Sequence, residues 1–191
     1  MVFSSAVFIF IFLPVILFLY YIFPDKFKNY ILLISSIFFY AWGEPVFVLM
    51  MLVSIGINFF MALLLEKYKK SKKKYILTSA VIFNLGILVI FKYTNFIINN
   101  INNLFNLNIF IHHINLPIGI SFFTFQALSY IIDAYREITP VQHRPVNIAL
   151  YISFFPQLIA GPIIKYHDIY RQLSSRLHSP ELMAEGFKRF I

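Results

Sequence analysis

The sequence contains no cysteine, which excludes disulfide bridges and thiolate metal sites within its 191 residues. Charged residues are also scarce, at 13% of the chain, whereas soluble domains contain about 25%. Acids are the rarer sign, with 8 Asp and Glu against 16 Lys and Arg. The sequence shows no glycine-rich phosphate loop, nucleophile elbow or metal-binding motif. The common signatures of soluble enzymes are therefore missing.

What is present is strongly apolar. Hydrophobic residues make up 60% of the chain and include 24 phenylalanines, and the mean hydropathy is +0.76. This composition is typical of an integral membrane protein. The net charge of +8 comes from residues between the apolar runs, where Lys and Arg set topology and contact lipid headgroups. We therefore expect the lipid bilayer as a partner, and no nucleic acid.

The apolar runs predict an all-α, polytopic transmembrane protein with about five spans. The first run has no basic start and no small-residue cleavage site, so we expect it to be a retained span rather than a signal peptide. The predicted spans are 3–23, 30–42, 46–65, 75–92 and 117–133, followed by a re-entrant or broken helix at 146–164 and interfacial or cytoplasmic helices over 165–191.

Basic residues between the spans predict their orientation. The segment 66–74 contains six lysines and one acid, which places it in the cytoplasm by the positive-inside rule. Counting outward, the basic turn at 24–29 and the segment 136–144 also fall inside. The turn at 43–45 and the segment 95–115, which has no Lys or Arg, fall outside. The sequence thus predicts a multi-pass membrane protein with its N-terminus outside.

The run at 146–164 does not fit a simple crossing. Basic residues stand on both sides of it, at Arg144 and Lys165, and both favour the cytoplasm. Pro156 and the pair Gly161-Pro162 interrupt a helix within it. A re-entrant or broken helix satisfies both observations, and a kinked full span is the alternative.

Polar side chains mark the run at 117–136. Gln126, Ser129 and Tyr130 are expected either to hydrogen-bond to neighbouring helices or to line a polar pathway. Asp133 and Arg136 stand three residues apart, so they are expected to pair across one helical turn. In the following apolar run, Gln157 is expected to satisfy unwound backbone near the Gly161-Pro162 break.

Other segments carry local signals. The segment 95–115 holds eight asparagines and predicts either an amphipathic segment on the outer surface or a plain loop. Glu44 is expected to cap the helix that follows Pro45. Tyr166, Ile169, Tyr170, Leu173 and Leu177 share one helical face, which predicts an interfacial helix. Ser179-Pro180-Glu181 predicts a helix start, and that helix reaches Ile191 without a cap, so we expect the natural chain to be longer.

The chain contains four ordered blocks, Met1–Ser5, Phe39–Pro45, Pro117–Arg136 and Phe154–Ile163. Together they resemble the membrane-bound O-acyltransferase (MBOAT) family. Their order and spacing are most similar to the bacterial alginate O-acetyltransferase branch, and the D-alanyl transfer protein of teichoic acid modification is a more distant relative. The resemblance covers essentially the whole chain, and the two later blocks are the more specific.

The resemblance implies a multi-span enzyme without a bound cofactor. Such an enzyme takes an acyl group, here expected to be acetyl, from a cytoplasmic donor such as acetyl-CoA or an acyl carrier. It passes the group through a channel to an extracytoplasmic acetyltransferase partner that acylates a polysaccharide. The polar residues named above then become candidates for the channel or the donor side. They are Gln126, Ser129, Tyr130, Asp133, Arg136 and Gln157.

The resemblance also implies a catalytic histidine within the membrane. None of His112, His113, His143, His167 and His178 lies in the middle of a predicted span. We therefore assign no catalytic residue here and expect that histidine beyond Ile191, so that the segment alone is inactive. The neighbouring pair at 112 and 113 lacks a third ligand, so no metal site is expected.

Two functional hypotheses follow. The first is that the chain is the N-terminal half of an O-acyltransferase. The second is that it is a non-enzymatic membrane scaffold or channel-like subunit, a hypothesis that the absence of a recognisable set of catalytic residues favours.

Overall fold

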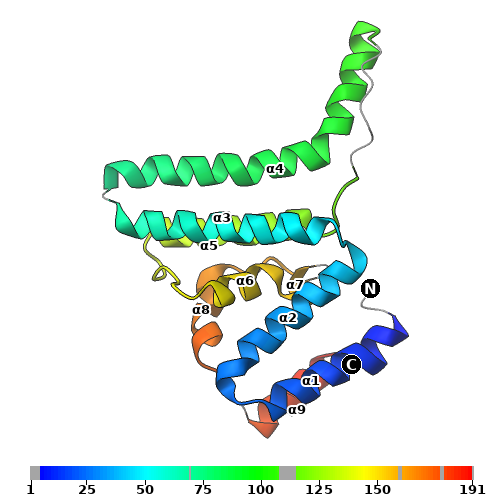
Figure 1. Cartoon of the computed structure of the whole chain (residues 1–191), viewed down its shortest axis with the longest axis vertical. Helices are drawn as coiled ribbons and strands as arrows, with labels where there is room; N and C mark the ends of the chain where they lie inside the picture. Colours follow the sequence, from blue (N-terminus) through cyan, green and yellow to red (C-terminus); the bar gives the residue numbers. More distant parts are fainter. Residues whose placement is uncertain (1–4, 69, 108–114, 159–160, 177–178, 191) are drawn as a thin grey trace.

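A computed structural model describes residues 5–68, 70–107, 115–158, 161–176 and 179–190. All regular secondary structure within these ranges is helical, which confirms the predicted all-α class. Figure 1 shows the arrangement of the helices. The elements are η1 (Phe8–Phe12), α1 (Leu13–Ile22), α2 (Asp25–Gly43), α3 (Phe47–Lys67), α4 (Lys70–Phe105), α5 (Ile120–Tyr135), α6 (Pro145–Ser153), α7 (Phe155–Leu158), α8 (Tyr166–Ser174) and α9 (Pro180–Phe190).

Two helices in the described ranges are long and apolar enough to cross a membrane, namely Phe47–Lys67 and Ser71–Phe105. The apolar helix Phe8–Ile22 is shorter. The 21 residues of α3 extend ~31 Å at 1.5 Å per residue, which matches a hydrocarbon core of about 30 Å. Helix length and apolarity therefore support two spans, and the count of about five stays a prediction.

The helix α2 contains the predicted span 30–42 and begins before it. In the structure α2 begins at Asp25, so the residues predicted as a basic turn form its first turns. Lys28 Nζ lies 2.7 Å from Asp25 Oδ1 one turn earlier, and an acid at a helix N-terminus interacts favourably with the exposed amides. These local interactions stabilise a polar helix start that hydropathy excludes.

The helix α4 likewise contains the predicted span 75–92 and is longer than it. In the structure α4 continues through Asn95 to Phe105, and Figure 1 shows its last part bending away from the other helices. Asparagine is tolerated there because its amide can bond to the helix itself: Asn100 Nδ2 donates to the Phe96 carbonyl at 2.7 Å. Up to Phe105 this segment is therefore neither a plain loop nor a separate amphipathic piece. The His112-His113 pair lies outside the described residues.

Helix α5 is the centre of the fold. It contacts α3, α4, α6 and α8, and ten of its 16 residues are buried. Gly119 precedes it with φ 79°, a left-handed conformation that glycine adopts without strain. A Cβ at this position would lie 2.9 Å from the Leu158 carbonyl oxygen, so α7 approaches the start of α5 closely. The polar side chains of α5 therefore face protein rather than lipid.

The segment predicted to be re-entrant or broken is interrupted in the structure. The helix α6 ends at Ser153, Phe154 has ψ 112°, and the four-residue α7 follows. Beyond residue 161 the chain is non-helical until α8 begins at Tyr166. Arg144, before this segment, and Arg176, after it, line the same pocket. Arg144 and Arg176, which flank the segment and α8, therefore lie close together.

Ion pairs connect the loops at this end. Lys73 Nζ lies 2.7 Å from Glu137 Oε1, and His143 Nε2 lies 3.2 Å from Glu66 Oε2. These pairs join the lysine-rich 66–74 segment to the 136–144 segment. The two segments that the positive-inside rule placed on one side of the membrane thus lie together.

The turn between α2 and α3 contacts the start of α5. Glu44 Oε1 accepts a hydrogen bond from the Ile118 backbone N–H at 3.4 Å, and no side-chain bond from Glu44 caps α3 among the described contacts. The expectation that Glu44 caps the helix after Pro45 was therefore wrong. The Ile118 backbone N–H, just before α5, lies close enough to donate to this carboxylate instead.

The predicted interfacial helix packs against the core. The helix α8 contacts α5 and α6, and Tyr166 and Leu173 on its apolar face are 1% and 7% exposed. Leu177 and His178 lie outside the described residues. The helix α9 begins at Pro180, and Ser179 Oγ accepts a hydrogen bond from the Leu182 N–H at 3.2 Å. The apolar face of α8 is thus used for tertiary packing.

Candidate functional site

Four polar side chains form a stripe along one face of α5. Gln126, Ser129, Tyr130 and Asp133 recur at intervals of three and four residues, which places them on the same side of a helix. The loop after α5, the helix α7 and the start of α8 lie against this face. Each of the four side chains bonds to one of these elements, so the stripe holds the broken segment and α8 against α5.

Asp133 bonds to His167, the second residue of α8. Asp133 Oδ2 accepts a hydrogen bond from the His167 backbone N–H at 3.1 Å and lies 3.0 Å from Nδ1 of the same residue. The Asp133 side chain is 8% exposed. Because an ionised carboxylate can only accept hydrogen bonds, this contact places a proton on Nδ1. The carboxylate therefore fixes both the backbone and the ring of His167.

The expected pair between Asp133 and Arg136 does not form, since no ion pair joins these two described residues. Arg136 is the C-cap residue after α5 and is exposed. The expectation assumed that both residues belong to the helix and have no nearer partner. The start of α8 instead supplies His167, which lies 34 positions away in the sequence. Of the six candidates, Arg136 thus stands apart from the stripe.

The His167 ring lies between two carboxylates. Its Nε2 atom is 3.3 Å from Asp168 Oδ1, and its side chain is 34% exposed. With Nδ1 held by Asp133, the second ring nitrogen faces Asp168, whose side chain is 55% exposed. His167 was not predicted as a site residue, because it stands in the basic tail of the sequence. A usable signal was available: a carboxylate buried in an apolar helix needs a cationic or hydrogen-bonding partner.

A tyrosine cluster surrounds Ser129. Ser129 Oγ accepts a hydrogen bond from the Tyr166 backbone N–H at 3.1 Å. The Tyr166 ring lies 4.8 Å from that of Tyr130 and 5.2 Å from that of Tyr151, both in edge contact. Tyr130 Oη accepts from the Gln142 backbone N–H at 3.3 Å. Burial raises the pKa of Tyr166 to about 12, so its phenol stays neutral at physiological pH.

Two glutamine side chains meet deeper along the stripe. Gln126 Nε2 donates to Gln157 Oε1 at 3.0 Å. Gln157 was expected to satisfy unwound backbone, but in the structure its carbonyl oxygen binds a side chain of α5. Gln126 is 1% exposed, and its Oε1 atom has no hydrogen-bond partner among the described residues. A buried free acceptor of this kind can bind a hydroxyl group or a water molecule.

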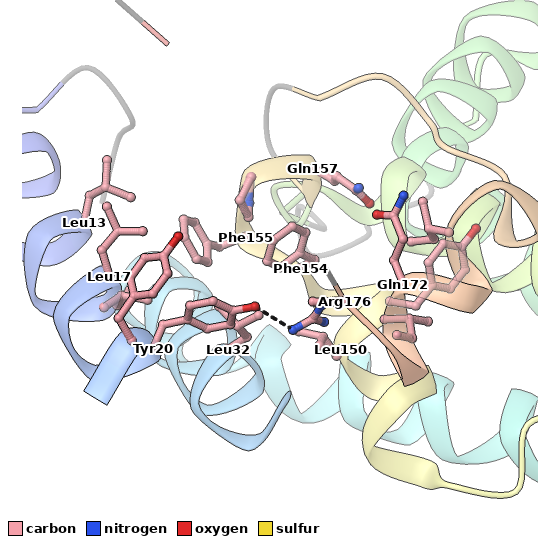
Figure 2. A pocket seen from close by; sticks show the side chains of 16 residues that line it. Leu13, Leu17, Tyr20, Leu32, Leu150, Phe154, Phe155, Gln157, Gln172 and Arg176 are labelled. Carbon is pink, nitrogen blue, oxygen red and sulfur yellow. Dashed lines mark hydrogen bonds between the residues drawn. The ribbon is translucent and has the colours of Figure 1, made fainter. Parts of the chain in front are cut away.

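A cavity of about 380 Å³ opens beside this site. Figure 2 shows apolar side chains of α1, α2, α6 and α7 around it, with Gln157 at its edge and Arg176 bonded to Tyr20. Its lining also includes Leu13, Leu17, Leu32, Leu150, Phe154 and Phe155. Within the described ranges, no group of three or more His, Asp or Glu side chains could hold a metal ion.

Comparisons with known proteins find relatives that align with all or most of the chain. The chain is 39% identical over 198 residues to the probable alginate O-acetylase of Pseudomonas aeruginosa, and 39% identical over 197 residues to that of Azotobacter vinelandii. Over 206 residues it is 32% identical to the peptidoglycan O-acetyltransferase of Helicobacter pylori. These alignments cover 100%, 100% and 92% of the chain.

The chain belongs to the membrane-bound O-acyltransferase family.

This MBOAT chain spans about two fifths of the length of these relatives, at 38%, 40% and 39%. No family model matches the chain. No solved structure matches it either.

Three of the MBOAT-like blocks meet around α5. The block Phe39–Pro45 reaches the block Pro117–Arg136 through the Glu44 carboxylate and the Ile118 N–H. The latter block reaches Phe154–Ile163 through the two glutamines. The segments that carry the family resemblance are thus in direct contact, although the two bonds join positions that are 74 and 31 residues apart in the sequence.

Proposed function

We propose that this MBOAT chain is the N-terminal part of an enzyme that transfers an acetyl group to an extracytoplasmic polysaccharide. The alignment with O-acetyltransferases over the whole chain carries this proposal. The named acceptors of these relatives differ, one being alginate and the other peptidoglycan. What they share is O-acetyl transfer, so the reaction class comes to this chain and the acceptor polymer stays open.

We further propose that the chain crosses the bacterial plasma membrane about five times, with its N-terminus outside and the 146–164 segment re-entrant. The contacts between the 66–74 and 136–144 segments support one cytoplasmic end. Arg144 and Arg176 line one pocket, which supports a segment that dips into the membrane and returns. Backbone without helical bonds survives at such depth only where protein satisfies it, and α5 supplies that protein surface.

In this proposal the α5 stripe holds the donor-side wall of the enzyme. Asp133 and His167 lie near the cytoplasmic end, where acetyl-CoA or an acyl carrier would deliver the acetyl group. Gln126 lies two turns further along α5 and offers a free buried acceptor toward the path of that group. His167 acts as a positioning residue, since its Nδ1 atom is occupied by Asp133. The catalytic histidine lies beyond Ile191, and an extracytoplasmic acetyltransferase partner completes the transfer.

The test is deletion of the gene in its source organism, followed by measurement of ester-linked acetate in the cell-surface polysaccharide after mild alkaline release. We expect the acetate to fall to background and to return with the full-length wild-type gene. Complementation with Asp133→Asn should restore less than a tenth of it, because the amide loses the charge that holds the His167 ring.

Arg171→Gln is the matched control, since Arg171 is exposed on the same helix α8. It should restore acetate fully. Unchanged acetate in the deletion strain would contradict the enzyme hypothesis and favour a scaffold or channel-like subunit.

A further inference from the structure

Two neighbouring pockets of different character lie where α1, α2, α6 and α8 meet. The first is the apolar cavity of about 380 Å³ shown in Figure 2. The second, of about 360 Å³, is lined by polar and charged side chains. The two share the residues Gln172, Leu173 and Arg176 in their linings, so they adjoin at this point. An apolar space thus lies directly beside a polar one.

The second pocket is strongly basic. Four basic side chains line it against one acid, Asp25. The basic residues come from three separate places in the fold: the start of α2, the residue before α6 and the segment after α8. They are Lys26, Lys28, Arg144 and Arg176. Tertiary structure, rather than one run of sequence, creates this charge.

Hydrogen bonds fix the elements that form the basic pocket. Asn29 Nδ2 donates to Asn147 Oδ1 at 2.8 Å and to the Leu173 carbonyl at 2.7 Å. One side chain of α2 thereby holds both α6 and the last turn of α8. These bonds hold together the three elements beside which the basic groups lie.

Two cations converge on one aromatic ring between the pockets. Lys28 Nζ lies 5.0 Å and Arg176 Cζ 5.9 Å from the centroid of Tyr20, and Arg176 Nη1 donates to the Tyr20 hydroxyl at 3.3 Å. Asp25 pairs with Lys28 at 2.7 Å. The C-terminal carbonyls of α8 offer only about half an elementary negative charge. An anion bound here would offset the remaining repulsion between the cations.

We propose that the two pockets together bind one anionic phospholipid of the surrounding membrane. The phosphate lies among Lys26, Arg144 and Arg176, and one acyl chain fills the apolar cavity between α1 and α6. Both halves of the site are needed for this ligand class: a soluble phosphate would use the basic pocket alone, and a neutral lipid would use the apolar cavity alone. Cavities of several hundred cubic ångströms are in the range that holds such ligands.

The experiment uses the full-length protein, purified in a neutral detergent and titrated with lipid while bound lipid is counted by native mass spectrometry. The probes are dioleoylphosphatidylglycerol, dioleoylphosphatidylcholine, which has the same chains on a zwitterionic head, and glycerol 3-phosphate, which has the phosphate without chains. We expect phosphatidylglycerol to bind at least tenfold more tightly than phosphatidylcholine, and millimolar glycerol 3-phosphate to leave it bound.

Variants separate the two halves of the site. Arg176→Gln should weaken phosphatidylglycerol binding about fivefold, the effect of one cation near an anionic headgroup. Arg171→Gln, the same change five residues earlier and outside both linings, should leave it unchanged. Leu17→Trp narrows the apolar cavity and should also weaken binding. If Arg176→Gln fails to fold, Arg144→Gln, on an exposed side chain, takes its place.

Four results would overturn the proposal. Equal affinity for the two lipids, or equal effects of the two arginine variants, would show that the basic pocket does not select the headgroup. Displacement by glycerol 3-phosphate would identify a site for a soluble phosphate. No lipid retained by the full-length protein would show that another part of the protein fills the cavity.

Discussion

Asp133 shows how a single polar residue organises a buried site. Its carboxylate is largely buried, and both of its short contacts go to one residue, His167. A buried charge without a partner is strongly unfavourable, so the fold has to bring α8 to this point of α5. The interaction therefore ties together two segments that carry no local signal for each other.

The Asp133–His167 contact predicts a measurable coupling energy. In a double-mutant cycle with Asp133→Ala and His167→Ala, we expect about 1.5–3 kcal/mol in the free energy of unfolding, the range for a hydrogen bond to a charged group. The backbone bond from residue 167 survives the histidine substitution, so the cycle isolates the ring contact. The measurement is SDS-induced unfolding in mixed micelles, followed by circular dichroism.

The exposed pair Glu66–His143 is the matched control for this cycle. It joins the same residue chemistry at 3.2 Å, but its side chains are 50% and 67% exposed. Exposed ion pairs couple by about 0–1 kcal/mol. Similar coupling in the two pairs would mean that burial does not strengthen the Asp133 contact and that its positioning role is wrong.

At the residue scale, sequence patterns predicted which side chains of α5 matter but not what they bind. Four of the polar residues recur on one helical face, and that periodicity can be seen in the sequence. Three of them bond to Gln157, Tyr166 and His167, which lie 31 or more positions away. Tyr130 bonds to Gln142, which lies 12 positions away. Local periodicity contains no information about such distant contacts, which explains why Asp133 was paired with the nearby Arg136.

At the element scale, helix positions were predictable and helix ends were not. Hydropathy located the apolar centres of α2 and α4 but ended them where polar residues begin. Asp25 and Lys28 stabilise the first turn of α2, and Asn100 bonds within α4. Polar side chains that satisfy the helix itself are invisible to a hydropathy scale, so both helices are longer than expected.

Two asparagine side chains, to which the sequence patterns gave no role, join helices α3 and α4 by reciprocal hydrogen bonds. Asn58 Nδ2 donates to Asn84 Oδ1 at 3.1 Å, and Asn84 Nδ2 donates back to Asn58 Oδ1 at 2.7 Å. Both side chains are buried, at 0% and 1% exposure. Each amide also donates to a carbonyl of its own helix. Two isolated asparagines in apolar helices are a usable signal for such an interhelical contact.

This amide pair predicts non-additive substitutions. Asn58→Leu and Asn84→Leu should each destabilise the protein, because each leaves the opposite amide without its partner. The double variant should lose less than the sum, with a coupling of about 0.6–1.7 kcal/mol, the range for interhelical bonds in membranes. Asn100→Leu, which removes an exposed amide whose bond among the described residues lies within α4, should change stability little. Strict additivity in the unfolding free energies would show that the pair does not hold α3 and α4 together.

At the scale of the whole molecule, local contacts support the predicted orientation of the chain in the membrane. This orientation can be tested directly. The positive-inside rule and the contacts among the basic segments both favour one cytoplasmic end. The deciding segment is 146–164, because a re-entrant path and a full crossing place everything after it on opposite sides of the membrane. Sequence alone left these two paths open, since Pro156 and Gly161-Pro162 interrupt a helix in either case.

The absence of cysteine in these 191 residues makes accessibility labelling a clean test of this topology. In the full-length protein, with any cysteine outside this segment replaced by serine, single cysteines are placed at the exposed positions Lys72, Asn99 and Ser175. Intact cells are treated with a membrane-impermeant maleimide. We expect Asn99→Cys to be labelled, because α4 carries the chain to the outer surface. Lys72→Cys and Ser175→Cys should be labelled only after the cells are permeabilised. The cysteine-free parent is the control and should stay unlabelled in both conditions.

Labelling of Ser175→Cys in intact cells, with Lys72→Cys still protected, would mean that 146–164 crosses the membrane fully. Since Arg144 and Arg176 line one pocket, that outcome would also contradict the arrangement of α6 and α8 on which the lipid site depends.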